Sequence, residues 1–275
     1  MKQLVLTLCL FASFSLFGDA IVISDRHNFK NADAISNYQE QRTVKLKAPF
    51  ISGSLDEEEW LARVKDKKIV VVIHGYNNDY REALRFFTKV KNRSNDFYDT
   101  HICYMWPGGD QTQEYFSARS RVTGFNLPDR LLNLLEDAAA NGKSVDIIAH
   151  SMGCRLALEA LSFDSALSIG NVFLMAAAID NGALERGQEY SGAIQRCEKI
   201  YGFYSKNDKV VREYYPIVEW DKGFGAVGSQ NPSKLPADIQ AINCSSFIDS
   251  HGNYAGSDEM FEMIGEILSD LRMEN

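Results

Sequence analysis

The chain has 275 residues, and 45% of them are hydrophobic, which is enough to bury one large core. Its formal net charge is −8 and its sequence pI is near 5.2. An acidic balance of this size argues against nucleic acid or an anionic membrane surface as a partner. It excludes these classes without selecting one of the many classes that remain.

The amino terminus has the composition of a secretory leader. Lys2 precedes an apolar run from Leu4 to Phe17, and Gly18 and Ala20 put small residues at both positions of a cleavage site. The run is too short to predict a stable membrane span. We therefore predict a signal peptide at residues 1–20 and a periplasmic or secreted protein. A buried strand or helix, and with it a cytoplasmic protein, is the alternative.

Residues 21–67 are polar and mixed, and we interpret them as an N-terminal extension with an edge strand at 43–48. From residue 68 onwards apolar strands alternate with amphipathic helices, which is the pattern of parallel βαβ units. The expected strands cover 68–74, 99–106, 145–149, 170–176, 199–204 and 241–247, and the expected helices cover 80–93, 128–140, 155–161 and 258–273. Most of these strands lack polar alternation, as strands covered on both faces do. The sequence thus predicts an α/β catalytic domain over 68–275, with a mostly parallel central sheet flanked by helices on both faces.

Two further segments look like insertions at the carboxyl edge of this sheet. Residues 111–124 form the first, and residues 221–236, rich in Gly, Ser and Pro, form the second. Insertions at this edge commonly build lids or pocket walls. For the second we expect either a mobile flap or a plain surface loop.

The segment 145–154 reads as an apolar strand that runs directly into a serine and then a helix. Ala149, Ser151 and Gly153 form an Ala-x-Ser-x-Gly version of the nucleophile elbow, a turn so tight that its flanking positions must be small. Such a turn exposes Ser151 Oγ above the amino end of a helix, where free N–H groups can meet an oxyanion. An ordinary strand-to-helix turn is the alternative.

A nucleophilic serine needs a base, and the five histidines allow one to be chosen by elimination. His27 lies in the polar leader, His74 and His101 lie at ends of core strands, and His150 is the x residue of the elbow. His251 follows the last apolar strand in a loop that can carry its imidazole over Ser151. A solvent-exposed loop histidine is the alternative.

The acid that orients the histidine should follow a strand between the serine and the histidine. Asp208 follows the strand 199–204 and is our first choice, with Asp180 as the alternative acid and Asp249 as a third. A turn former or a helix cap is the structural alternative for Asp208.

The first core strand ends in His74-Gly75-Tyr76-Asn77-Asn78. The glycine lets backbone N–H groups face a ligand, so the Tyr76 and Met152 amides are the expected oxyanion hole. Trp106, Tyr115 and Phe116 are candidate pocket walls, and packing in the core is the alternative for each of them.

Without the leader four cysteines remain, namely Cys103, Cys154, Cys197 and Cys244, and their spacing is not that of a zinc site or a disulfide scaffold. We expect Cys103 and Cys154 in the core. A Cys197–Cys244 bridge is conceivable in an exported protein, and free thiols are the favoured state.

Taken together, these motifs resemble the α/β-hydrolase superfamily over residues 68–270. The narrower resemblance is to an uncharacterised bacterial branch, and it rests on His74-Gly75-Tyr76-Asn77-Asn78, Trp106-Pro107-Gly108, Ala149-His150-Ser151-Met152-Gly153, Lys206-Asn207-Asp208 and Ser250-His251-Gly252. It implies a serine nucleophile with aspartate and histidine partners, and a strand-end tyrosine amide as oxyanion donor. Two departures are Ala149 in place of the usual glycine and the run 175–178 in place of a Gly/Pro-rich turn.

The sequence therefore predicts a serine hydrolase of carboxylic esters or related acyl compounds. Ser151, His251 and Asp208 would form the triad on a small-molecule acyl substrate, without a metal or an organic cofactor. A non-catalytic binding protein of the same fold is the main alternative. An acyltransferase or a peptidase with the same triad is a further one.

Overall fold

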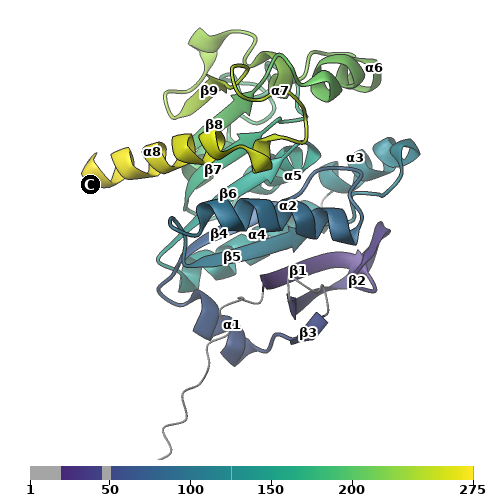
Figure 1. Ribbon diagram of the computed structural model, residues 1–275, viewed down its shortest axis with the longest axis vertical. Coiled ribbons are helices and arrows are strands. Elements are labelled where there is room, and N and C mark those ends of the chain that lie inside the picture. Colours follow the sequence, from purple (N-terminus) through teal and green to yellow (C-terminus); the bar gives the residue numbers. More distant parts are fainter. Residues whose placement is uncertain (1–19, 45–50, 125, 275) are drawn as a thin grey trace, which may run out of the picture.

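The computed structural model describes residues 20–44, 51–124 and 126–274, and these residues contain one nine-stranded sheet (Figure 1). The strand order is β3-β2-β1-β5-β4-β6-β7-β8-β9. The strands are β1 (Ala20–His27), β2 (Asn31–Val44), β3 (Ile51–Ser54), β4 (Lys68–Ile73), β5 (Thr100–Met105), β6 (Ser144–His150), β7 (Ile169–Met175), β8 (Cys197–Tyr204) and β9 (Ile239–Asn243). From β1 to β9 every neighbouring pair is parallel, and β2 and β3 add an antiparallel edge.

Helices cover both faces of the sheet, which confirms the predicted fold class. They are α1 (Glu57–Val64), α2 (Tyr80–Ser94), α3 (Tyr115–Thr123), α4 (Asn126–Asn141), α5 (Met152–Leu161), α6 (Tyr215–Glu219), α7 (Phe224–Val227) and α8 (Asp258–Glu274). The helices α2 and α8 cross the front of the sheet in Figure 1, and α4 and α5 lie behind it. Apolar side chains of α1, α3, α4 and α5 join one core cluster, and those of α2 and α8 join the other.

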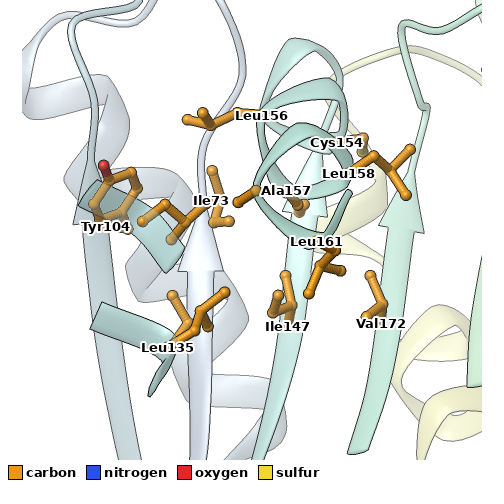
Figure 2. Packing of buried hydrophobic residues seen from close by; sticks show 14 of the residues in the cluster. Ile73, Tyr104, Leu135, Ile147, Cys154, Leu156, Ala157, Leu158, Leu161 and Val172 are labelled. Carbon is orange, nitrogen blue, oxygen red and sulfur yellow. The ribbon is translucent and has the colours of Figure 1, made fainter. Parts of the chain in front are cut away.

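The alternation of side chains along each strand supplies both clusters. In β4, Val71 and Ile73 face one cluster and Val70 and Val72 face the other, and all four are buried. Figure 2 shows the first cluster, where Ala157 of α5 and its neighbours lie against residues of the central strands. A strand that is apolar at every position is thus the signature of a sheet covered on both sides.

The amino-terminal segment contributes more to the sheet than the single edge strand that we expected. β1 pairs in parallel with β5, and β2 pairs with β1 in antiparallel fashion. The expected strand at 43–48 corresponds only to the end of β2 at Val44, and residues 45–48 lie outside the described residues. The predicted leader lies outside them too, except for Ala20, which begins β1. Its removal in the cell stays a prediction.

The first part of the segment 221–236 is neither a flap nor a plain surface loop, because it is packed against the ends of β7 and β8. Phe224 and Ala226 are completely buried, and Gly225 N–H donates to the Ala177 carbonyl at 2.9 Å. A Cβ on Gly225 would come within 2.3 Å of the Ala176 backbone, which leaves room for glycine alone. The other insertion, 111–124, contains α3.

Cys103, Cys154, Cys197 and Cys244 are all free thiols, so the conceivable bridge is not formed. Within the described part of the chain, no helix has the length and apolar character needed to cross a bilayer.

Candidate active site

Ser151 stands on a strained turn between β6 and α5. Its backbone has φ 55° and ψ −124°, a conformation rarely adopted by a non-glycine residue. The strain is imposed by the close approach of helix and strand, because a Cβ on Gly153 would lie 2.3 Å from the His74 carbonyl oxygen. Ala149 is completely buried in register with Ile73, and its methyl group is accommodated there. The turn thus has the geometry of the predicted elbow.

The structure brings Ser151, His251 and Asp208 together. His251 Nε2 lies 3.0 Å from Ser151 Oγ, and His251 Nδ1 lies 2.8 Å from Asp208 Oδ2. A carboxylate accepts, so Nδ1 carries the proton, and Nε2 is left to accept from the serine hydroxyl. Asp208 is fully buried and its other oxygen accepts the Val211 N–H at 3.0 Å, which fixes the carboxylate. This is the donor and acceptor order that general-base activation of a serine requires.

The alternative acid lies elsewhere. Asp180 Oδ1 accepts a hydrogen bond from the Tyr215 hydroxyl at 2.7 Å, and Tyr215 accepts one from Arg155 at 2.9 Å. The third candidate, Asp249, bonds the Asn253 amide in its own loop. The place beside the His251 imidazole is therefore occupied by Asp208.

Tyr76 and Met152, the predicted oxyanion donors, both line the cavity that contains Ser151. Met152 is the first residue of α5, so its N–H has no acceptor within the helix. Tyr76 lies in the loop after β4 and lines the same cavity as Ser151. The loop approaches Ser151 closely because the residue before Tyr76 is a glycine: a Cβ on Gly75 would lie 3.1 Å from Ser151 Cβ. These are the two N–H groups that the sequence predicted as oxyanion donors.

A cavity of about 700 Å³ opens beside the serine at the carboxyl edge of the sheet. Tyr115 lines it, as expected, and its hydroxyl donates to Glu219 at 2.7 Å. Trp106 was wrongly assigned to the pocket, because it is completely buried, stacks on His74 and donates to the His74 carbonyl. Phe116 is neither a lining residue nor a core residue, since it is 63% exposed, and its ring forms a T-shaped pair with that of Tyr115.

His150 is a residue of the site that elimination from the sequence set aside. Its ring lies 4.6 Å from that of His251, and its Nε2–H donates to the His251 carbonyl at 2.9 Å. Burial first, and then the neighbouring His251, lower the pKa of His150 to about 3, so it is neutral. His150 thus holds the loop that carries the base. The sequence gives a weak indication of His150, because the residue directly before the nucleophile of an elbow must lie close to the groups around the serine.

The family model described as "Alpha/beta hydrolase of unknown function" matches residues 54–265. Among curated protein sequences, none matches this one.

Solved structures with a similar fold share little sequence with the chain. The poly(3-hydroxybutyrate) depolymerase LpqC from Bordetella parapertussis is 11% identical with a TM-score of 0.45, covering 75% of this chain and 85% of that one. Est1E from Butyrivibrio proteoclasticus, solved with ferulic acid, is 11% identical with a TM-score of 0.43, and the coverage is 76% and 89%. TT1662 from Thermus thermophilus is 11% identical with a TM-score of 0.46, and the coverage is 77% and 91%. Similarity this distant says nothing about the substrate of this chain. The family match covers most of the sequence, and on it the chain belongs to the α/β hydrolases of unknown function.

Proposed function

We propose that the protein is a serine hydrolase that cleaves carboxylic esters through an acyl-enzyme. The observation that carries the proposal is the continuous chain of hydrogen bonds from Asp208 through His251 to Ser151, at 2.8 and 3.0 Å. Chains of this kind activate a hydroxyl that is otherwise a weak nucleophile.

In the proposed reaction, Ser151 Oγ attacks the ester carbonyl carbon and its proton passes to His251 Nε2. The negative charge that develops on the carbonyl oxygen is stabilised by hydrogen bonds that the Tyr76 and Met152 N–H groups donate. Asp208 remains a carboxylate and stabilises the imidazolium. Collapse of the intermediate breaks the ester C–O bond, and His251 gives its proton to the departing alkoxide. Water then attacks the acyl-enzyme with His251 again as base, which releases the acid and restores Ser151.

Hydrolysis of p-nitrophenyl esters by purified protein tests this proposal. We expect turnover by the wild type and a loss on the order of 10⁶ in kcat for Ser151→Ala, as for removal of a triad nucleophile. The matched control is Ser162→Ala, at the end of α5, where the hydroxyl donates to the Leu158 carbonyl 2.7 Å away and takes no part in the site. Ester turnover that survives Ser151→Ala would overturn the proposal. Transfer of the acyl group to added alcohols, or faster cleavage of matched amides, would reassign the acceptor or the leaving group.

A further inference from the structure

The cavity beside Ser151 has two walls of different chemistry. One wall comes from the helical turn η3 (Val210–Tyr214) and from α6, and its lining residues are Val210, Val211, Tyr214, Tyr215, Ile217 and Val218. A second wall comes from α2 and is mixed, with Arg85, Phe86 and Lys89. We call the first the apolar wall.

The apolar wall continues from the cavity onto the surface. Four of the seven exposed large hydrophobic residues in the described part of the chain fall between residues 210 and 220, namely Val210, Tyr214, Ile217 and Trp220. Tyr214 is 64% exposed and Ile217 is 67% exposed, although both line the cavity. A contiguous apolar surface that leads into a site is typical of a binding groove.

The inner side of the apolar wall is anchored, so its outer side cannot turn inward. The Tyr215 hydroxyl bonds both Asp180 and Arg155, at 2.7 and 2.9 Å. Glu219 accepts hydrogen bonds from the side chains of Tyr115 and Arg119. The groove is therefore formed before any ligand arrives.

The two walls flank different parts of a bound ester. The Phe86 ring lies 5.4 Å from that of His150, which lies 4.6 Å from that of His251. The mixed wall therefore reaches the imidazole through the His150 ring, and an alcohol leaving group must depart beside the imidazole to receive its proton. We assign the alcohol to the mixed wall, and the acyl group then extends along the apolar wall.

We propose that the substrates of this site are esters of long aliphatic acids, with the acyl chain along the apolar wall from Ser151 to Tyr214 and Ile217. The proposal rests on the proposed function. Each methylene placed on this wall leaves water, and the apolar faces of Tyr214 and Ile217 are covered at the same time.

A series of p-nitrophenyl esters from acetate to decanoate, below their micelle concentrations, tests this with a constant leaving group. We expect kcat/KM to rise about three- to fourfold for each added CH₂ until the wall is filled. In the double variant Tyr214→Ser, Ile217→Ser, the decanoate-to-acetate ratio of kcat/KM should fall by about tenfold. Tyr38→Ser is the matched control, because Tyr38 is 67% exposed on β2 and does not line the cavity.

Acetate turnover without a gain for longer chains would overturn the acyl-chain proposal and leave the proposed function intact. So would a gain that the double variant and Tyr38→Ser reduce equally. No turnover of any ester would instead count against the proposed function itself.

A second and independent observation concerns Arg26, which lies on β1 before the first residue of the family match. Its side chain is completely buried. Nε donates to the Trp106 carbonyl at 2.9 Å, and Nη2 donates to the Asn78 carbonyl at 2.8 Å and lies 3.3 Å from His74 Nε2. The guanidinium thus bonds both ends of the loop 74–78, which carries the Tyr76 N–H.

The contacts of Arg26 also fix the state of His74. Because the guanidinium only donates, His74 Nε2 accepts, and His74 Nδ1–H donates to the Gly75 carbonyl at 2.7 Å. Burial and the Arg26 charge lower the pKa of His74, so the ring is neutral. One guanidinium therefore sets a histidine tautomer and, through it, the Gly75 carbonyl next to the Tyr76 amide.

Within the described part of the chain no acidic side chain contacts Arg26, and the charges of Asp79, Asp110 and Asp33 act on it only from a distance. No ion pair among the described residues includes it, and its Nη1 has no hydrogen-bond acceptor there. Burial lowers the pKa of Arg26 to about 10, so it remains a cation at neutral pH. An unpaired buried cation is destabilising, and groups of this kind persist where they serve a site. We infer that Arg26 is a positioning residue, which holds the loop 74–78 so that the Tyr76 N–H meets the oxyanion.

Steady-state kinetics of Arg26→Met and Arg26→Lys test this role. Loss of an oxyanion donor should lower kcat of Arg26→Met by about 100-fold with little change in KM, since the substrate groove is untouched. Arg26→Lys keeps the charge and some of the hydrogen-bond donors, so its kcat should lie between those of the wild type and Arg26→Met. Arg130→Met is the matched control, because Arg130 bonds Asp25 and the Ser36 carbonyl beside β1 without touching the loop.

Full kcat in Arg26→Met, or an equal loss in Arg130→Met, would contradict the inference. If Arg26→Met does not fold, Arg26→Lys decides. A kcat reduced at unchanged KM supports the role, and an unchanged kcat overturns it.

Discussion

Each acidic residue near the site has a different neighbour, and this difference separates their roles. Asp208 accepts a hydrogen bond from His251, whereas Asp180 accepts one from Tyr215, the first residue of α6. Replacing Asp208 by Asn removes the acceptor for Nδ1–H and favours the wrong imidazole tautomer. We expect kcat for ester hydrolysis to fall on the order of 10³–10⁴.

Asp180→Asn is the matched control for this prediction. It keeps an oxygen for the Tyr215 hydroxyl, so its kcat should stay within about tenfold of wild type. A larger loss in Asp180→Asn than in Asp208→Asn, measured at saturating substrate, would show that the acid is wrongly assigned.

His150 holds the loop that carries His251, the proposed base, through its hydrogen bond to the His251 carbonyl. We expect His150→Ala to lower kcat by about tenfold, because the loop loses the donor that holds it. His150→Gln restores a donor and should recover most of that loss. His101→Gln is the control, since His101 is a buried histidine that bonds Ser94, away from the site. Equal kcat values for His150→Ala and wild type would show that His150 does not position the loop that carries His251.

At this scale the sequence could identify Ser151, His251 and Asp208, because each follows a strand and the carboxyl ends of parallel strands meet. It could not identify Arg26, whose partners are 48 to 80 residues away in the chain and directly follow β4 and β5. It also could not separate Trp106 from the pocket. An aromatic residue at a strand end looks the same whether it faces the cavity or stacks on His74.

Among the elements, the elbow between β6 and α5 is the most constrained. A methyl group at Gly153 would meet the His74 carbonyl oxygen at 2.3 Å, and that oxygen belongs to the backbone. We expect Gly153→Ala to destabilise the protein by about 2–3 kcal/mol, as overpacking does, despite the better helix propensity of alanine. Denaturant unfolding measures the change.

Gly192→Ala serves as control, because nothing lies within 4 Å of a Cβ there. It should be nearly neutral. Equal stability of Gly153→Ala and Gly192→Ala would mean that strand and helix do not approach as described.

The elements from β4 onwards were predictable, because fully apolar strands and 3.6-residue periodicity mark them. The last strand differs at its boundary: it ends at Asn243 and not at 247, because the chain turns after Cys244, whose carbonyl accepts the Ile248 N–H at 2.8 Å. β1 was missed for a physical reason. Asp25 and Arg26 are buried polar residues whose main partners, Arg130 and the Trp106 carbonyl, lie far away in the chain, so local patterns cannot reveal them.

For the whole molecule, three buried histidines make the free energy of unfolding depend on pH. Burial lowers the pKa of His101 and His150 to about 3 and that of His74 well below 6.5. In the unfolded chain these rings titrate near 6.5, so between pH 6.5 and about 3 the unfolded state binds more protons. The stability that these neutral histidines contribute is therefore fully present above pH 6.5 and is lost as the pH falls from 6.5 toward about 3.

Each buried histidine should contribute up to roughly 1.4 kcal/mol per pH unit to this loss. His101→Gln removes one titrating group, so its unfolding free energy should fall less steeply than that of wild type between pH 6 and about 4. Urea unfolding across this range measures both slopes. Parallel slopes would show that His101 is protonated in the folded state.

The overall fold could be predicted because a single pattern, apolar strand followed by amphipathic helix, repeats through most of the chain. The antiparallel edge formed by β2 and β3 and the parallel β1 depart from that pattern. They bring Arg26 under the loop 74–78, so the function that we assign depends on a part of the sheet beyond the repeated units.

Stoichiometric labelling with a fluorophosphonate, followed by mass mapping of the modified peptide, tests directly whether Ser151 is the activated nucleophile. We expect one adduct per chain, on Ser151, formed at a rate that drops by orders of magnitude in His251→Ala, because the imidazole activates the hydroxyl. Folded wild-type protein that takes no label, or an adduct on another residue, would contradict the account.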